Sequence, residues 1–425
     1  MTAETTASQK PEVVSTTTKA CLSCGGDSLA SILSLGKTPL ANALLTEADL
    51  NKPEPSFALD LVFCPACTLV QITEEVPRAA MFSDYLYFSS FSDTMLQHAR
   101  AIADRLTREK KLDAGSLVVE VASNDGYLLQ FYEKAGVPVL GIEPAANVAK
   151  VAEEKGIRTL VRFFGTNTAE ELRASGERAD VIHANNVLAH VLDLNGFVGG
   201  FATLLKDDGV AVIECPYVRD LVEKCEFDTI YHEHLCYFSL TALDHLMARH
   251  GLFIFDVERL SIHGGSLRLF VRKAGLDGVA RTDGVTALLD DEAAADVDKL
   301  AFYEGFADRV KSLKDDLLAL LSDLKAKGAR VAAYGAAAKG ATLLNFFGIG
   351  RDTIDFVVDR STYKQGRYMP GTRIPIRPPA ALVEKSPDYC LLLAWNFADE
   401  ILEQQREYRA RGGKFIVPIP SVRVA

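Results

Sequence analysis

Two cysteine pairs near the start of the chain have the spacing of a metal site. Cys21 and Cys24 form one C-x-x-C pair, and Cys64 and Cys67 form the other. Such a pair bends the backbone so that its thiolates converge, and two pairs complete a tetrahedral S₄ shell suited to Zn²⁺. Two disulfides or two redox pairs are the alternatives. We predict that these four cysteines bind one zinc ion, in a shell that leaves no open position for a substrate.

A second reactive group is the run Tyr231, His232, Glu233 and His234. Four such side chains are costly to bury unless they have a function. A histidine with a pKa near neutrality can remove a proton from a carbon next to a carbonyl. In an extended segment His232 and His234 point the same way, with Glu233 opposite. The alternatives are a surface loop or a second metal site formed by His232 and His234, with or without Cys236.

A third group predicts a nucleoside-binding site. A predicted strand at 116–121 leads into a short polar loop, and Glu143 follows the next predicted strand, at 138–142. The carboxylate of Glu143 can accept hydrogen bonds from both ribose hydroxyls, and glycine allows close approach of a ligand. G-x-G-x-x-G is absent, so S-adenosylmethionine (SAM) fits better than NAD; an ordinary strand–helix turn is the alternative. The predicted cofactor-binding residues are Ser123, Asn124, Asp125, Gly126, Glu143, Asn185 and Asn186.

A glycine- and alanine-rich turn follows a later predicted strand, at 330–334. The turn, G-A-A-A-K-G at residues 335–340, exposes backbone N–H groups and the positive end of a helix, which favours phosphate. The alternative is that its glycines only pack the helix on the sheet. The predicted substrate-binding residues here are Lys339, Asp359, Lys364 and Arg367.

Strands that alternate with helices must position these groups. After a predicted helix at 92–111, the first series predicts a parallel sheet with an antiparallel end; its strands are 116–121, 138–142, 179–183, 209–214, 252–258 and 266–272. A predicted helix at 299–327 leads to a second series, with strands at 330–334, 354–359, 389–393 and 414–417. The predicted fold is α/β, with a zinc-binding module, a Rossmann-like domain and a second doubly wound α/β domain. The predicted boundaries are a disordered tail at 1–18 and domains at 19–80, 81–275 and 276–425.

Composition excludes several classes of protein. The 425 residues are 48% hydrophobic and 24% charged, and the net charge of −11 argues against a nucleic-acid partner. No apolar segment is long enough to cross a bilayer. The first 18 residues lack an apolar stretch, so we expect a disordered tail and not a signal peptide. The four cysteines outside the two pairs are scattered, so we expect a cytoplasmic protein without a disulfide framework.

Motifs in all three predicted domains resemble one enzyme family. Besides the cysteine pairs, they are Y-x-Y-F-S-S at 85–90, S-N-D-G-Y-L-L at 123–129, G-I-E-P-A-A-N-V at 141–148, Y-H-E-H at 231–234, G-A-A-A-K-G at 335–340, and K-Q-G-R followed by P-G-T. Their order is similar to that of the SAM-dependent sugar C-methyltransferases of deoxysugar biosynthesis, such as the C-3′-methyltransferases of the tetronitrose pathway. Only the first eighteen residues fall outside the resemblance. Ala122 departs from it, because many relatives carry glycine there.

The resemblance implies methylation of the carbon beside the ketone, at C-3′, of a nucleotide-linked (dTDP) 4-keto-6-deoxy sugar. Loss of a proton from that carbon gives an enolate, which makes the carbon nucleophilic. In the family's pattern His234 aligns with the base. Tyr231 and Glu233 lie beside the substrate, His190 lies near a sugar oxygen, and Tyr85 or Tyr87 supplies a phenol. The resemblance also implies a structural zinc. Separately from the resemblance, we expect a monomer or a homodimer.

Two other functions remain open from the sequence. One is a SAM-dependent methyltransferase that acts on oxygen or nitrogen of a small metabolite. The other is a non-catalytic, zinc-dependent ligand-binding protein, which the crowded segment 231–234 disfavours.

Overall fold

The middle part of the chain is built on a seven-stranded sheet. The computed structural model describes residues 15–77, 81, 88–275 and 280–425. The strand order is β12-β13-β10-β9-β6-β7-β8. β6 through β10 run parallel where they pair, whereas β13 pairs antiparallel with both β10 and β12. The predicted parallel sheet with an antiparallel end is confirmed. The strands are β6 Val118–Val121, β7 Val139–Ile142, β8 Thr159–Leu160, β9 Ala179–Asn185, β10 Leu205–Pro216, β12 Leu252–Leu260 and β13 Ser266–Lys273.

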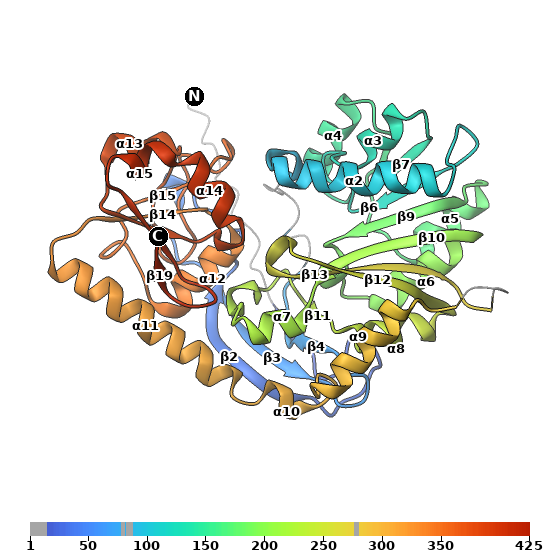
Figure 1. Ribbon diagram of the computed structural model, residues 1–425, viewed down its shortest axis with the longest axis horizontal. Coiled ribbons are helices and arrows are strands. Elements are labelled where there is room, and N and C mark those ends of the chain that lie inside the picture. Colours follow the sequence, from blue (N-terminus) through green and yellow to red (C-terminus); the bar gives the residue numbers. More distant parts are fainter. Residues whose placement is uncertain (1–14, 78–80, 82–87, 276–279) are drawn as a thin grey trace, which may run out of the picture.

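Helices cover both faces of this sheet (Figure 1). Because both faces are covered, a central strand such as β6 is buried at every position, as expected for a parallel sheet. Ser92 caps the helix α2 by accepting a hydrogen bond from Met95 N at 3.3 Å. The helices are α2 Asp93–Glu109, α3 Leu129–Lys134, α4 Ala146–Glu154, α5 Thr166–Ala174, α6 Leu194–Leu204, α7 Val218–Glu223 and α8 Leu240–Arg249, with short 3₁₀ turns η2 Ser89–Phe91, η3 Leu188–His190, η4 Phe227–Thr229 and η5 Ile262–Gly264.

The cysteine-rich module contributes a four-stranded sheet in the order β11-β4-β3-β2. Its strands β2 Ala30–Pro39, β3 Ser56–Phe63 and β4 Val70–Ile72 come from the N-terminal region, with η1 Glu47–Asp49 between β2 and β3. The edge strand β11, Cys236–Tyr237, comes from the middle of the chain and pairs antiparallel with β4. The sequence did not predict this shared sheet, because two residues carry too little pattern to assign a partner.

The predicted disordered tail is wrong for its last residues. Thr16–Thr17 form β1, which pairs antiparallel with β5, Glu74–Glu75. Ser15 and Thr17 also donate hydrogen bonds to the Glu74 carboxylate. Residues 1–14 lie outside the described residues.

The C-terminal part begins with a helical segment that is broken once. The predicted helix at 299–327 is two helices, α10 Leu300–Tyr303 and α11 Phe306–Ala326, after α9 Asp283–Ala294. Gly305 separates them with a φ of +76°, in the left-handed region where a helix cannot continue. α11 is a long helix that leads to the second α/β unit (Figure 1).

That unit has a six-stranded sheet in the order β16-β15-β14-β17-β18-β19. All neighbours are parallel except β18 and β19, so the predicted second α/β domain is confirmed. The elements are β14 Val331–Tyr334, α12 Ala338–Phe347, β15 Val357–Val358, β16 Ile376–Arg377, α13 Ala380–Lys385, β17 Tyr389–Leu392, η6 Trp395–Phe397, α14 Ala398–Gln404, α15 Arg406–Ala410, β18 Lys414–Val417 and β19 Arg423–Val424.

The three parts meet around one centre. β2 of the zinc module lies against α11 and α12 of the C-terminal part, and α12 also contacts η4 of the middle part. Figure 1 shows the zinc-module sheet lying beneath both α/β units. None of the helices among the described residues is long and apolar enough to cross a membrane.

Candidate active site

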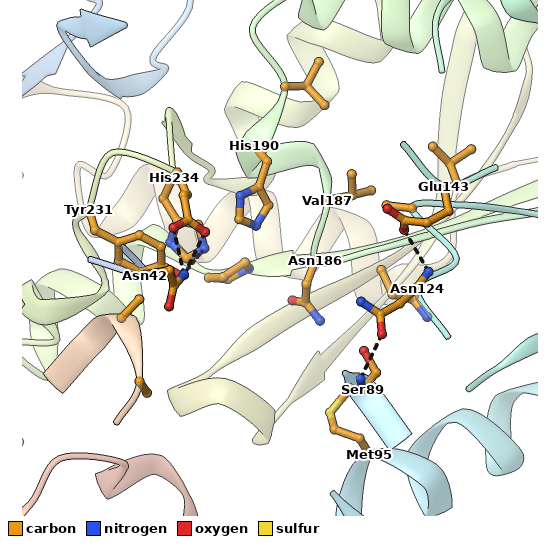
Figure 2. A pocket seen from close by; sticks show the side chains of 18 of the residues that line it. Asn42, Ser89, Met95, Asn124, Glu143, Asn186, Val187, His190, Tyr231 and His234 are labelled. Carbon is orange, nitrogen blue, oxygen red and sulfur yellow. Dashed lines mark hydrogen bonds between the residues drawn. The ribbon is translucent and has the colours of Figure 1, made fainter. Parts of the chain in front are cut away.

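A cavity of about 310 Å³ lies where the three parts meet. Asn42 of the zinc module, the ends of β6, β7 and β9, and the loops after β14 and β17 all contribute to its lining. The carboxyl edges of parallel strands in both α/β units therefore face one cavity, the place where ligands bind in such sheets. Figure 2 shows its polar residues in two groups, one around His234 and Tyr231 and the other around Asn124 and Glu143.

His234 has a defined tautomer in this cavity. Its Nδ1 lies 2.9 Å from the carbonyl oxygen of Thr229, and its Nε2 lies 2.8 Å from the hydroxyl of Tyr231. Because a carbonyl only accepts, Nδ1 carries the proton and donates, and Nε2 holds the lone pair that accepts from Tyr231. The ring of His190 stands edge-on, 4.7 Å from that of His234 (Figure 2). The arrangement leaves Nε2 of His234 able to take a proton once Tyr231 turns away.

Burial changes the protonation of the two neighbours of His234. It lowers the pKa of His190 to about 4, so this imidazole is neutral at pH 7. It raises the pKa of Glu233 to about 7. Asn42 and Lys364 oppose that rise, because a donated hydrogen bond and a positive charge both favour the carboxylate. Near neutral pH, Glu233 can therefore act in either form.

The segment 231–234 is a turn, not the extended segment expected from the sequence. His234 N donates to Tyr231 O at 2.8 Å, and Tyr231, Glu233 and His234 line the cavity while His232 does not. His232 Nε2 instead lies 2.9 Å from Ala58 O in the zinc module. The prediction that His232 and His234 point the same way is wrong, because the turn rotates one away from the other.

Backbone hydrogen bonds join the chain directly after segment 231–234 to the zinc module. Immediately after His234, Ile72 N donates to Leu235 O at 3.0 Å, and Cys236 pairs with Gln71 in the β11–β4 ladder. Thus one edge of the module's sheet continues directly into the turn that carries His234.

The second polar group surrounds the ends of β6 and β7. Glu143 accepts hydrogen bonds from Asn124 N at 2.9 Å and Ala145 N at 2.8 Å (Figure 2). Asn124 Oδ1 in turn accepts from Ser89 N at 2.9 Å. Burial raises the pKa of Glu143, and the two backbone donors oppose that rise. Glu143 and Asn124, two of the predicted cofactor-binding residues, both line the cavity.

Two asparagines complete this end of the cavity. Asn185 and Asn186 both line it, and their buried Oδ1 atoms have no hydrogen-bond partner among the described residues. Buried acceptors without donors favour a ligand that supplies N–H or O–H groups. An adenosine ribose and an amino-acid ammonium supply both, so the residues present fit SAM.

The other predicted cofactor residues shape the loop from outside the cavity. Ser123 is fully buried, and Asp125 pairs with Lys155 at 3.1 Å. Gly126 has a φ of +75°, and a Cβ there would lie 2.9 Å from Ile157. Glycine is therefore required here for packing, and the role of Gly126 in close approach of a ligand stays a prediction.

Ala122 has an unusual backbone conformation. It lines the cavity with a φ of +55°, in the left-handed region that favours glycine. The departure from the family pattern thus falls at a position where Cβ costs conformational energy.

Two of the four predicted substrate residues reach the cavity. Lys339 and Lys364 line it together with Ala337 and Ala338 at the start of α12. Asp359 instead accepts from Ala336 N and Ser361 N, both at 2.8 Å, and thereby closes its own loop. Arg367 is absent from the lining.

The glycines of this loop have a packing role. A Cβ on Gly335 would lie 2.7 Å from Ala394, and one on Gly340 would lie 2.8 Å from Leu393. Close packing of loop and helix on the sheet, the alternative drawn from the sequence, accounts for both positions.

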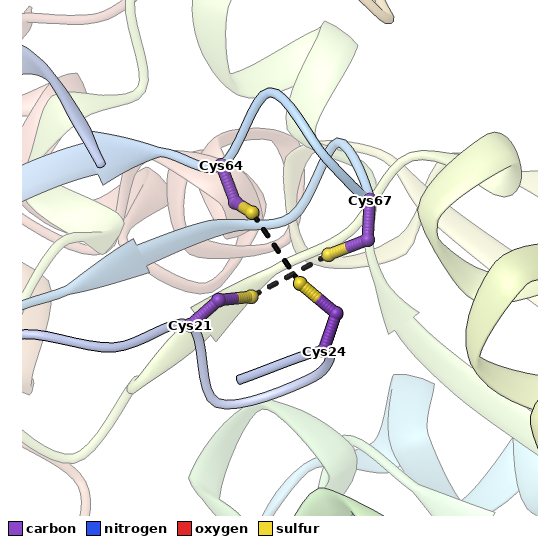
Figure 3. A group of neighbouring side chains, drawn as sticks. All are labelled: Cys21, Cys24, Cys64 and Cys67. Carbon is purple, nitrogen blue, oxygen red and sulfur yellow. Dashed lines mark hydrogen bonds between the residues drawn. The ribbon is translucent and has the colours of Figure 1, made fainter. Parts of the chain in front are cut away.

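The four cysteines form a separate centre. Their sulfur atoms all lie within 4.8 Å of one another, with Cys21–Cys67 at 3.4 Å and Cys24–Cys64 at 3.6 Å (Figure 3). A tetrahedral Zn²⁺ with Zn–S bonds of about 2.3 Å places sulfurs about 3.8 Å apart, so the residues fit zinc. None of the four lines the cavity, and the zinc is structural. Among the described residues no other group of three potential ligands gathers, so the alternative of a second metal site at His232, His234 and Cys236 is not formed.

Some contributors to the cavity escaped the sequence analysis. Asn42 is a lone polar residue in the zinc module, and Thr229 acts through its backbone carbonyl, so neither carries a sequence signal. Tyr85 and Tyr87, predicted to supply a phenol, lie outside the described residues.

Family models match the three parts of the chain in order. They are "Putative zinc binding domain" at residues 21–82, "Methyltransferase domain" at 95–256 and "C-methyltransferase C-terminal domain" at 261–420. The C-methyltransferase NovU of Streptomyces niveus is 37% identical over 404 residues, which cover 95% of this chain and 96% of NovU.

Other relatives and solved structures match smaller shares of the chain. A ubiquinone biosynthesis O-methyltransferase of Rhodopseudomonas palustris is 32% identical over 113 residues, 26% of this chain and 44% of the relative. Among solved structures, the PH0226 protein of Pyrococcus horikoshii matches with a TM-score of 0.36 and 15% identity, over 46% of this chain and 98% of that one.

The chain therefore belongs to the family of SAM-dependent C-methyltransferases with an N-terminal zinc-binding domain. It is an enzyme, which sets aside the alternative of a non-catalytic ligand-binding protein.

Proposed function

We propose that this enzyme methylates the carbon beside the ketone, at C-3′, of a dTDP-linked 4-keto-6-deoxy sugar. The observation that carries the proposal is the Nε2 lone pair of His234, which lies in a cavity shared by the cofactor end and the C-terminal lysines. A carbon acid needs such a base, because the carbon becomes a nucleophile only after it loses a proton.

At one end of the cavity, Asn124, Glu143, Asn185 and Asn186 would hold SAM, which supplies an electrophilic methyl group when bound. Glu143 would accept hydrogen bonds from the ribose hydroxyls. The unpaired amide oxygens of Asn185 and Asn186 would accept from the ammonium group. Ser123, Asp125 and Gly126 fix the shape of the loop behind these side chains.

In the middle of the cavity, Nε2 of His234 takes the proton from the carbon. The carbonyl of Thr229 keeps the proton of the neutral ring on Nδ1 and then stabilises the imidazolium, which still donates from that atom. The hydroxyl of Tyr231 must first leave Nε2, and it then becomes a donor for a substrate oxygen. The turn of 231–234 brings both residues to the same reacting group.

The negative charge that develops on the ketone oxygen needs donors. Glu233, with its pKa near 7, can donate in its protonated form, and His190 lies beside His234 as a neutral ring. Tyr85 or Tyr87 remains a candidate for a further phenol donor.

At the other end, Lys339, Lys364 and the first N–H groups of α12 form a positive wall suited to a diphosphate. Asp359 positions the loop before α12, and Lys364 donates to Ala336 O at 2.9 Å in the same loop. Arg367 remains a predicted contact to the nucleotide.

All eight cysteines are free of disulfides, which supports a reducing, cytoplasmic location. We infer a small-molecule acceptor, with neither nucleic acid nor membrane as a partner, and a monomer or a homodimer.

The test is incubation with SAM and a panel of dTDP-4-keto-6-deoxy sugars, followed by mass spectrometry. The sugars carry deuterium at the acceptor carbon. We expect the product to gain one methyl group and to lose this deuterium label. Methylation that leaves this label in place would indicate transfer to oxygen or nitrogen. Binding of SAM without methylation of any sugar would overturn the substrate class.

A further inference from the structure

A buried hydrogen bond joins the C-terminal part to the segment before His234. Trp395 Nε1 donates to Asp228 Oδ2 at 2.7 Å, and these residues are 167 positions apart in the sequence. Asp228 is completely buried and Trp395 is 8% exposed. Because both groups are buried, loss of one partner leaves the other polar group unsatisfied.

Both ends of this contact continue into the cavity. Asp228 precedes Thr229, whose carbonyl accepts the Nδ1 proton of His234. Trp395 begins η6, whose next two residues, Asn396 and Phe397, line the cavity. The hydrogen bond between Trp395 and Asp228 therefore connects the cavity-lining residues of η6 with the backbone carbonyl of Thr229 that holds His234.

The surroundings of the contact are built from the same two parts. Phe227 stacks on Phe347 of α12, with ring centres 5.0 Å apart and planes 18° from parallel. Lys339 Nζ lies 4.5 Å from the centre of the Trp395 ring. Stacking of flat rings tolerates sliding, whereas a hydrogen bond from indole to carboxylate has one preferred direction. The contact between Trp395 and Asp228 therefore adds a directional restraint on the position of η4 against the C-terminal part.

We propose that Asp228 and Trp395 are positioning residues for His234, through which the docked C-terminal part keeps the carbonyl of Thr229 on Nδ1. The contact thereby selects the tautomer that has its proton on Nδ1 and its lone pair on Nε2. The proposal rests on the role of His234 as base only for its catalytic consequence; its structural content is the tautomer itself.

Trp395→Phe is the first test, because it keeps a ring against Lys339 and removes the donor. Histidine-specific ¹⁵N labelling assigns His234 by comparison with His234→Asn and reports which ring nitrogen carries the proton. We expect the Nδ1–H form to dominate in the wild type and to lose that dominance in Trp395→Phe. When the substrate is a sugar that the wild-type enzyme methylates, the kcat of Trp395→Phe should fall on the order of tenfold to a hundredfold. The Kd for SAM should stay unchanged.

Three further variants keep the test sharp. Asp228→Ala removes the acceptor and should reproduce the change of tautomer, which tests the same contact if Trp395→Phe does not fold. Asp228→Asn retains an oxygen acceptor for Trp395, so in this variant the Nδ1–H form of His234 should remain dominant, as in the wild type. Tyr408→Phe removes another buried hydrogen bond of the C-terminal part, from Tyr408 OH to Pro387 O at 3.0 Å, and should lower the melting temperature without changing the tautomer.

An unchanged Nδ1–H form of His234 in folded Trp395→Phe and Asp228→Ala would overturn the proposal. A change of tautomer in Tyr408→Phe as well would also overturn it, because the effect would then be general destabilisation. Because the tautomer is read without turnover, failure of the wild-type enzyme to methylate any sugar would count against the proposed function and not against this contact.

Discussion

Asn42 and Glu233 are 191 residues apart in the sequence, yet the amide of Asn42 donates to both carboxyl oxygens of Glu233, at 2.7 and 2.9 Å. The pair joins the zinc module to the segment that carries His234. Since Asn42 also lines the cavity, the module contributes directly to the site and does not only support it.

Replacement of Asn42 should shift the ionisation of Glu233. Donated hydrogen bonds favour the carboxylate, so in Asn42→Ala the pKa of Glu233 should rise above its value of about 7. If Glu233 acts as a protonated donor, the alkaline limb of the kcat–pH profile moves to higher pH. The measurement is the kcat–pH profile of the wild type and of Asn42→Ala with a sugar that the enzyme methylates.

Stability should change in a related way. A buried carboxyl with a raised folded-state pKa is stable in its protonated form below the unfolded-state pKa of about 4.3, and it loses stability as pH rises through about 7. Asn42→Ala should therefore lower the free energy of unfolding by about 1–3 kcal/mol at pH 8, and less at pH 5. Asn345→Ala is the control, because Asn345 donates only to the carbonyls of Ala341 and Pro370. A pH-independent loss in Asn42→Ala would contradict the role of Glu233.

The two histidines of the turn should separate in function. His234→Asn should abolish turnover while the Kd for SAM stays near normal, since Asn124 and Glu143 belong to a different group in the cavity. His232→Asn should lower the melting temperature, because it disturbs the bond to Ala58 O, and should retain most of kcat. Calorimetric titration with SAM and initial rates measure the two effects. Substantial activity in His234→Asn would transfer the role of base to Glu233 or a tyrosine.

Much of the fold followed from local patterns. Apolar runs such as 116–121 mark buried parallel strands whatever their neighbours are, and the four cysteines identify their own partners by spacing. The cavity was harder to predict because its geometry depends on turns and distant contacts. His232 contacts Ala58 O, 174 residues away in the sequence, and the tautomer of His234 depends on a backbone carbonyl that any residue at position 229 would supply.

Ala122 should be replaceable by glycine with a gain in stability. Its φ of +55° costs an alanine about 1–2 kcal/mol, part of which is offset by the greater freedom of glycine in the unfolded chain. Urea unfolding of Ala122→Gly should therefore give a rise of about 0.5–1 kcal/mol. Ala149→Gly, in the middle of α4, should instead destabilise by about 1 kcal/mol. A loss of stability in Ala122→Gly would show that its methyl group makes contacts worth more than the backbone strain.

Removal of zinc should inactivate the enzyme before it unfolds. The β11–β4 ladder ends next to His234. Loosening of the zinc module therefore releases the turn that carries the base, while the seven-stranded sheet remains folded. Cys64→Ser should lower zinc content, soluble yield and melting temperature, since metal binding contributes to folding free energy. In titrations with a chelator, we expect kcat to fall at concentrations that leave the far-ultraviolet circular dichroism of the protein unchanged. Cys390→Ser, in β17 and away from the metal, is the matched control for loss of a buried thiol. A zinc-free protein that keeps full activity would show that the module does not hold the turn in place.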